Sequence, residues 1–187
     1  MRRRNSAALA FGLMAAVVSA CGKVDDSSTA GPESTPLTEV STSVPSSDAL
    51  PDFDACNELD AAFLRAHDLD AIDPRPVTNE VADYRWSGCI FQTSTYIGVH
   101  IGVTNATVED AISKDYTDTV ETVIGDRRAV HFDILTDNPG DCTLFVAMTG
   151  GSLDVEVDVF DREESRGTDP CQFAIDTAIA VEPLIPE

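Results

Sequence analysis

Four cysteines in the C-terminal part of the chain constrain its fold more than any other feature. They are Cys56, Cys89, Cys142 and Cys171. An even number of cysteines in an exported domain is typical of structural disulfides, and four cysteines allow three connectivities. No two of them have the two-residue spacing of zinc sites or thioredoxin-type motifs. We therefore expect neither a metal site nor redox catalysis from them.

The sequence around each cysteine favours disulfides between a helix and a strand. Cys56 and Cys171 each follow an aspartate that can cap a helix, and each falls in the first helical turn. Cys89 and Cys142 lie in strand-like runs. Because both helices must turn their apolar stripe toward the sheet, helix-to-strand pairs are favoured. We predict Cys56–Cys89 and Cys142–Cys171, each closing a loop of about 30 residues that contributes roughly 3–4 kcal/mol in the chain-entropy model.

Hydrophobic periodicity predicts an α+β fold. Helical spacing appears over residues 56–66 and 171–181, and alternation between them predicts an antiparallel sheet with one helical insertion. The expected strands are 84–93, 97–103, 119–124, 127–135, 142–148 and 153–159; the insertion is 107–115, and turns are expected at 125–126, 137–140 and 150–151. We expect the N- and C-terminal helices to pack on the same face of the sheet.

The start of the chain has the parts of a secretory signal. Three arginines precede an uncharged stretch over residues 6–20, which is too short for a typical membrane-spanning helix. The stretch ends in Val18, Ser19 and Ala20, directly before Cys21. This pattern resembles the lipobox of bacterial lipoproteins, which implies recognition of those three residues by signal peptidase and acylation of the Cys21 thiol. An ordinary signal peptide followed by a chance cysteine is the alternative.

The region after the signal has the composition of a tether. Half of residues 22–51 are Ser, Thr or Pro, and their apolar neighbours have no period. Too little surface can be buried to offset the entropy of ordering such a segment. We therefore expect a signal peptide over residues 1–20, a lipidated Cys21 with a disordered tether over 21–51, and a single globular domain over 52–187.

The charge of the chain limits its partners. It has 33 acidic and 12 basic residues, a formal net charge of −21 at pH 7. Nucleic acid is an unsuitable partner because phosphate contacts need clustered cations. An anionic bilayer surface would also repel the domain, so the expected contact with the membrane is the acylated Cys21. This predicts a lipid-anchored protein on the extracytoplasmic side of the cell membrane.

Candidate binding residues come from the parity of the strands. Tyr96, His100, His131 and Phe145 are assigned to the sheet face that the two long helices leave open, as a shallow surface for a small ligand or peptide. Two solvated histidines on ordinary strands are the favoured alternative. No nucleophile elbow, phosphate loop, dinucleotide fingerprint or zinc-hydrolase motif occurs, so we expect no enzyme and no cofactor.

A row of carboxylates occupies alternate positions of the last predicted strand. Asp154, Glu156 and Asp158 could together bind a hard cation. A solvated strand face that resists edge pairing is the favoured interpretation, and no metal site is predicted.

Together these features resemble the DUF3558 family of actinobacterial lipoproteins. The resemblance rests on the lipoprotein signal, the tether, the early Asp-x-Cys at Cys56, the mid-chain Cys89 near an aromatic residue, and the late Asp-Pro-Cys at Cys171 before an alanine-rich helix. Ala55 replaces a proline, and Phe91 stands where tryptophan is common. The resemblance implies a sheet with helices, similar in layout to the sensor domain of some mycobacterial kinases or to PsbP/Mog1-like lipoproteins.

The resemblance implies no activity and no catalytic residues. The expected function is therefore a non-enzymatic, membrane-anchored module that binds an envelope protein or a small ligand. An accessory subunit of a membrane complex, without a ligand of its own, is the alternative.

Replacement of Cys21 by alanine tests the anchor. We expect the domain to stay folded and the protein to leave the membrane fraction, since acyl chains supply the membrane affinity. Cell fractionation with metabolic palmitate labelling measures both effects. Labelled palmitate on the Cys21→Ala protein would contradict the predicted anchor.

Overall fold

The computed structural model describes residues 49–114, 116–133, 140–160 and 163–186. The chain divides into two units, Met1–Thr42 and Ser43–Glu187, and all described residues belong to the second. The predicted signal, the lipidation site and nearly all of the tether lie outside the described residues, as does most of the turn expected at 137–140. Within the described part, no helix is long and apolar enough to cross a membrane.

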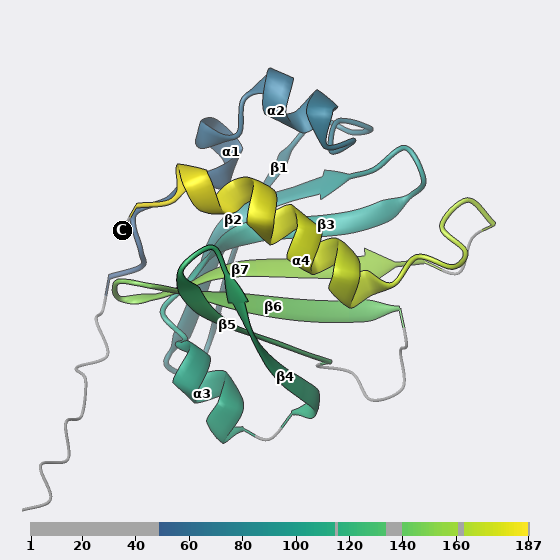
Figure 1. Ribbon diagram of the computed structural model, residues 1–187. Coiled ribbons are helices and arrows are strands. Elements are labelled where there is room, and N and C mark those ends of the chain that lie inside the picture. The colour runs from purple at the N-terminus through teal and green to yellow at the C-terminus, as the bar shows by residue number, and fades with distance from the viewer. Residues whose placement is uncertain (1–48, 115, 134–139, 161–162, 187) are drawn as a thin grey trace, which may run out of the picture. The chain divides into compact units, whose positions relative to one another are not determined.

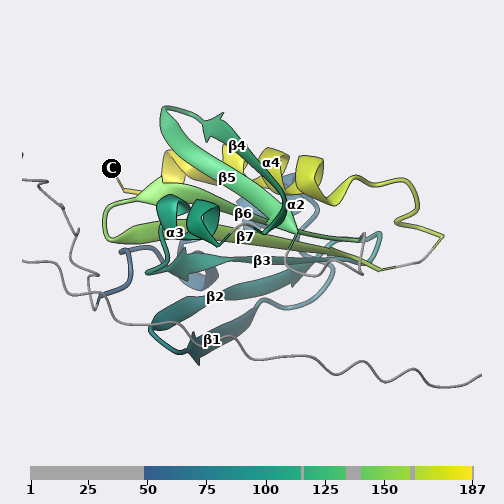
Figure 2. The same ribbon diagram turned by 90° about the horizontal axis from the view of Figure 1, so that it is seen from below.

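Seven antiparallel strands form one sheet in the order β1-β2-β3-β7-β6-β5-β4 (Figure 1). The strands are β1 Arg75–Val81, β2 Tyr84–Gln92, β3 Ile97–Thr104, β4 Thr117–Ile124, β5 Arg127–Asp133, β6 Asp141–Met148 and β7 Gly151–Val159. Figure 2 shows them side by side in this order. The sheet thus consists of two meanders, β1 to β3 and β4 to β7, which the pairing of β3 with β7 joins.

A polar side chain caps the N-terminus of each α-helix. The helices are α1 Ala55–Glu58, α2 Ala61–Ala66, α3 Val108–Ser113 and α4 Pro170–Val181, followed by the 3-10 helix η1 Glu182–Leu184. Asp54, Asp60 and Asp169 accept hydrogen bonds from backbone N–H groups of the first turns of α1, α2 and α4, and Thr107 forms a capping box at α3.

The prediction of one continuous helix over 56–66 is wrong. Leu59 adopts an extended conformation with ψ of 97°, and Asp60 then caps a second helix. The apolar residues recur at helical spacing across this break, so periodicity alone does not reveal it.

Both faces of the sheet have a hydrophobic core, but the cores differ in extent. The main core joins α1, α2 and α4 to one face of β2, β3, β7 and β6. A smaller core lies on the other face, where α3 covers Val130, Phe132 and Phe145. The predicted α+β class is therefore confirmed, with the N- and C-terminal helices on the same face.

Both predicted disulfides are confirmed. Cys56 of α1 is bonded to Cys89 of β2, with Cα atoms 5.2 Å apart, and Cys142 of β6 is bonded to Cys171 of α4, with Cα atoms 5.1 Å apart. Each bond attaches the first turn of a helix to the helix-covered face of a strand. The helical layer is thus tied covalently to the sheet at two separate points.

Strand β1 is the element that the sequence pattern did not predict. Its residues are mostly exposed, and Pro76 is among them. An edge strand hydrogen-bonds one neighbour only and can contain proline and polar residues. It therefore lacks the apolar alternation from which strands are predicted.

Two facing glycines make room on the sheet face opposite α4. Gly88 of β2 and Gly102 of β3 are register partners. A Cβ atom on Gly102 would lie 2.5 Å from the carbonyl oxygen of Ser87, 2.8 Å from the Cα of Gly88 and 3.0 Å from Cε1 of His100. The imidazole of His100 therefore lies beside backbone that has no side chains.

An alanine at Gly102 tests whether the backbones of β2 and β3 and the ring of His100 leave no room for a side chain there. We expect Gly102→Ala to lower the free energy of unfolding by about 1–3 kcal/mol, because the backbone atoms that the methyl group meets cannot move aside. Gly98→Ala on the same strand is the control: its Cβ would have its nearest contacts at 3.6 Å, so we expect a change within about 0.5 kcal/mol. Urea unfolding measures both variants, and equal stabilities would contradict the packing described here.

Candidate functional site

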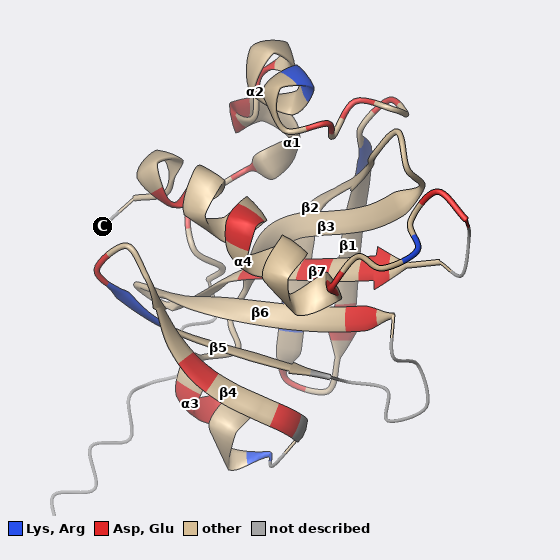
Figure 3. Cartoon of the chain, turned by 45° about the vertical axis from the view of Figure 1, so that its right-hand side comes forward, with Lys and Arg blue, Asp and Glu red and all other residues tan. Residues whose placement is uncertain are grey.

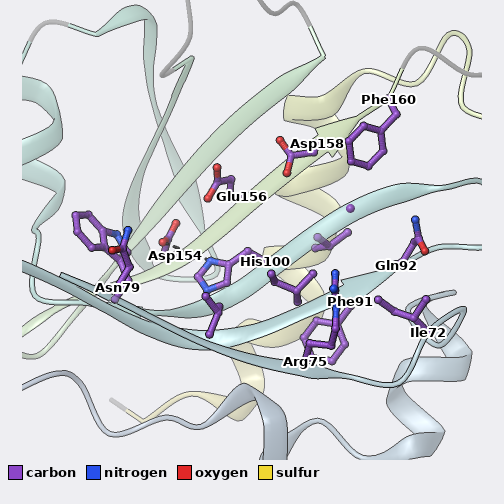
Figure 4. A pocket seen from close by; sticks show the side chains of 15 residues that line it. Ile72, Arg75, Asn79, Phe91, Gln92, His100, Asp154, Glu156, Asp158 and Phe160 are labelled. Carbon is purple, nitrogen blue, oxygen red and sulfur yellow. Dashed lines mark ion pairs between the residues drawn. The ribbon is translucent and has the colours of Figure 1, made fainter. Parts of the chain in front are cut away.

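A cavity of about 400 Å³ opens on the sheet face opposite α4 (Figure 4). Strands β1, β2, β3 and β7 line it, together with Ile72 before β1 and Phe160 after β7. Its volume lies within the range of small-molecule sites, and such sites combine apolar walls with a few polar groups. The cavity is therefore the candidate site of the domain.

Strand register brings the polar groups of the cavity together. His100 of β3 is the register partner of Glu156 on β7. Residues directly opposite each other share a face, as do alternate residues of one strand. His100 therefore shares its face with Asp154, Glu156 and Asp158, and Figure 4 shows these side chains lining the cavity.

Asp154 and His100 form a close, buried pair. Oδ2 of Asp154 lies 3.6 Å from Nδ1 of His100, and Asp154 is only 3% exposed. Neither Oδ1 of Asp154 nor Nδ1 of His100 has a hydrogen-bond partner among the described residues. Burial raises the pKa of Asp154 well above its usual range, with a smaller contribution from Glu156. Burial also lowers the pKa of His100 to about 4, so its imidazole is neutral at pH 7.

The acidic row continues from Asp154 along β7. Burial raises the pKa of Glu156, and the charge of Asp141 on β6 raises it further. The pKa of Asp158 is raised to about 6 by burial, by the charge of Glu156 and by a hydrogen bond with Asp141. Figure 3 shows acidic positions on the neighbouring strands β6 and β7. Four carboxyl groups thus lie close together where water solvates them poorly.

The interpretation of this row as a solvated face that resists edge pairing is wrong. β7 is the middle strand of the sheet, with β3 and β6 as its neighbours. Its acidic side chains therefore do not protect an edge. They line one wall of a concave surface.

The rest of the cavity surface is largely apolar and aromatic. Val77 of β1 and Ile90 of β2 contribute aliphatic surface, and Trp86 of β2 contributes an indole ring. Phe160 is 49% exposed and lies beside Asp158 (Figure 4). Arg75 of β1 is the lining residue with a permanent positive charge, and its strand is three positions away from β7.

The structure separates the four residues predicted to form a ligand face. His100 lines the cavity. Tyr96 lies in the β2–β3 turn with a φ of 63° and does not line it. Phe145 is on the same face of the sheet as His100 but packs under α3, where its ring is 5.3 Å from that of Phe132. His131 is the register partner of Leu144, whose side chain belongs to the main core.

The prediction that His131 shares the face of His100 is therefore wrong. It assumed that Val130 and Phe132 face the main core, which would turn His131 outward. Both residues instead pack under α3 in the smaller core. Each face of β5 is covered by a helix in part, so alternation along this strand does not tell which face is open.

His131 lies beside a disulfide. One ligand-type atom from each of His131, Cys142 and Cys171 falls within 4.8 Å of the others. Because the two sulfur atoms are bonded to each other, neither is the thiolate that a metal site needs. No other group of three such residues gathers as closely in the part of the chain that the structure describes.

Comparison with known proteins agrees with the sequence pattern. A family model described as "Protein of unknown function (DUF3558)" matches residues 16–184. No curated protein and no solved structure matches the chain significantly. The expected likeness in layout to kinase sensor domains and PsbP/Mog1-like lipoproteins therefore stays a prediction.

The Asp158→Asn variant tests whether folding raises the pKa of Asp158. Its pKa rises from 3.8 to about 6 on folding, so between about pH 4 and about pH 6 the folded protein holds a proton that the unfolded chain releases. The contribution of Asp158 to the free energy of unfolding is therefore lost as the pH rises from about 4 to about 6. We expect Asp158→Asn to gain stability relative to wild type from pH 4 to 6 and to keep a constant advantage above about pH 7.

Chemical unfolding across this pH range measures the difference. Asp126→Asn, in the exposed β4–β5 turn, is the control and should follow the wild-type profile. A pH-independent difference between Asp158→Asn and wild type would contradict the assigned pKa.

Proposed function

The chain belongs to the DUF3558 family, and we propose that its domain is a non-enzymatic module that binds a small ligand in the cavity over β1, β2, β3 and β7. One observation carries the proposal. The sheet face opposite α4 has a cavity of about 400 Å³, with a buried carboxyl group on its wall whose Oδ1 atom has no hydrogen-bond partner in the described structure. A concave site of this size suits a small molecule better than the flat surface of a protein partner.

The side chains of the cavity support binding rather than covalent catalysis. Among the described residues that line it, none is Ser, Thr, Cys, Lys or Tyr. His100 therefore has no nucleophile beside it to activate, and its imidazole is held neutral by burial.

The proposed setting is the extracytoplasmic side of the cell membrane. Cys21 would carry the acyl chains, and residues 22–51 would form a flexible connection to the domain. The net charge of −21 would keep the domain from adhering to anionic headgroups. The cavity would then be open to molecules in the envelope.

Native mass spectrometry of the full protein, extracted from its own membranes, tests this function. Gly98 lines the cavity, and a Cβ there would contact Cβ of Asp158 and the ring of Phe160 at 3.6 Å. A leucine at this position would therefore extend into the cavity from a Cβ whose nearest contacts are side-chain atoms. We expect wild type and Gly98→Ala to retain a small-molecule adduct that Gly98→Leu loses.

Two outcomes would contradict the proposal. An adduct retained in full by Gly98→Leu would place the ligand outside the cavity. A co-extracted protein subunit with no small-molecule adduct, unaffected by Gly98→Leu, would indicate an accessory subunit instead.

A further inference from the structure

We propose that the ligand is an organic cation, an ammonium or guanidinium group on an apolar body, with its charge held by Glu156 and Asp158. This inference rests on the proposed function and names the chemical class of its ligand. Four features of the cavity support it: the surplus of acidic over basic side chains among its described lining residues, a buried carboxyl oxygen without a hydrogen-bond partner in the described structure, the spacing of the acidic row, and the apolar surface opposite that row.

Among the described residues, the ion pairs of the arginines lie away from the acidic row. Arg127 pairs with Glu182, and Arg128 pairs with Glu109 and Glu121, all away from the cavity. Among the described residues that line the cavity, the permanent positive charge is that of Arg75 on β1. The backbones of β1 and β7 are separated by three strand spacings, about 14 Å along the sheet. A cationic ligand would place a positive charge beside the carboxyl groups of β7.

Burial strengthens the interaction of these carboxyl groups with a charged hydrogen-bond donor. Asp154 is 97% buried, since only 3% is exposed, and its Oδ1 atom lacks a hydrogen-bond partner among the described residues. Glu156 and Asp158 are half-buried farther along the same wall. Poorly solvated carboxylates gain most from donors that are themselves charged, because such hydrogen bonds are about twice as strong as neutral ones.

The spacing of the row favours an organic cation over a single metal ion. Alternate residues of a strand are about 6.8 Å apart, whereas two oxygen ligands of one Ca²⁺ ion lie at most about 5 Å apart. The row accordingly does not appear among groups of three ligand atoms within 4.8 Å of one another in the described part of the chain. An ammonium or guanidinium group has several N–H donors that can reach two carboxylates from a position between them.

The opposite wall suits an apolar body. Val77, Ile90 and Trp86 line the side formed by β1 and β2. Phe160 stands beside Asp158, and both approach the same point above Gly98 at 3.6 Å. A cation between that carboxylate and the ring would gain a cation–π contact with Phe160. A small hydrophilic cation would leave the remaining apolar surface uncovered.

Protons should compete with such a ligand. Among the described residues, Glu156 on β7 and Asp141 on β6 act on the carboxyl group of Asp158, and His100 on β3 and Arg75 on β1 line the same cavity. The pKa of Asp158 is about 6 in the unliganded protein, so its carboxylate is protonated as the pH falls below that value. Cation affinity should therefore decrease from about pH 7 to about pH 5.

Three indole probes of similar shape test the inference. They are tryptamine, a cation; indole-3-propionamide, which is neutral; and indole-3-propionate, an anion. Calorimetric titration of the full-length protein in detergent should show tryptamine binding at least about tenfold more tightly than the amide, with the anion weakest. Asp158→Asn should weaken tryptamine about tenfold without affecting the amide, and the surface control Asp126→Asn should affect neither.

Three other results would overturn the assignment of the ligand as an organic cation. Equal or tighter binding of the amide or the anion overturns the cation assignment and leaves small-ligand binding intact. Saturable Ca²⁺ binding that Asp158→Asn abolishes also overturns it, in favour of a metal ion. If no probe binds saturably up to millimolar concentrations, the cation assignment fails, while the adduct seen by native mass spectrometry decides the proposed function separately.

Discussion

The pairing of β3 with β7 is the interaction on which the rest of the structure depends. It joins two meanders into one sheet, with Ile97–Thr104 of β3 opposite Ser152–Val159 of β7. On one face it brings Ile101 beside Val155 in the main core. On the other face the same register sets His100 opposite Glu156 and Gly102 opposite Asp154. One set of backbone hydrogen bonds thus builds both the core and the candidate site.

The two faces of β7 have opposite energetic roles. Its inward residues, Leu153, Val155 and Val157, are fully buried and stabilise the fold through the hydrophobic effect. The carboxyl groups on the reverse face are poorly solvated, so their pKa values are raised. This destabilising arrangement is held between two neighbouring strands, and the disulfides tie the same sheet to its helices. Binding sites typically contain groups that lower the stability of the fold and are held in place by the structure around them.

Sequence patterns predict some features of the candidate site. The alternation of His100 with apolar residues predicts that it faces away from the main core, and the alternation of Asp154, Glu156 and Asp158 predicts three carboxylates on one side of a strand. The meeting of these groups was not predicted, since hydrophobic alternation tells which residues share a face of one strand but not which strands are neighbours. For His131 the same alternation led to the wrong face, because helices cover parts of both sides of the sheet.

The sequence by itself determined what local chemistry controls. Aspartate caps set the cysteines Cys56 and Cys171 in first helical turns, and apolar alternation turned Cys89 and Cys142 toward those helices, so the class and the disulfides could be predicted. The expected anchor at Cys21 likewise rests on adjacent residues. Only the tertiary structure decided that β7 is central, that β1 completes a cavity wall, and that an acidic row lies beside aromatic rings. These depend on pairing between strands distant in sequence, which residue periodicity does not encode.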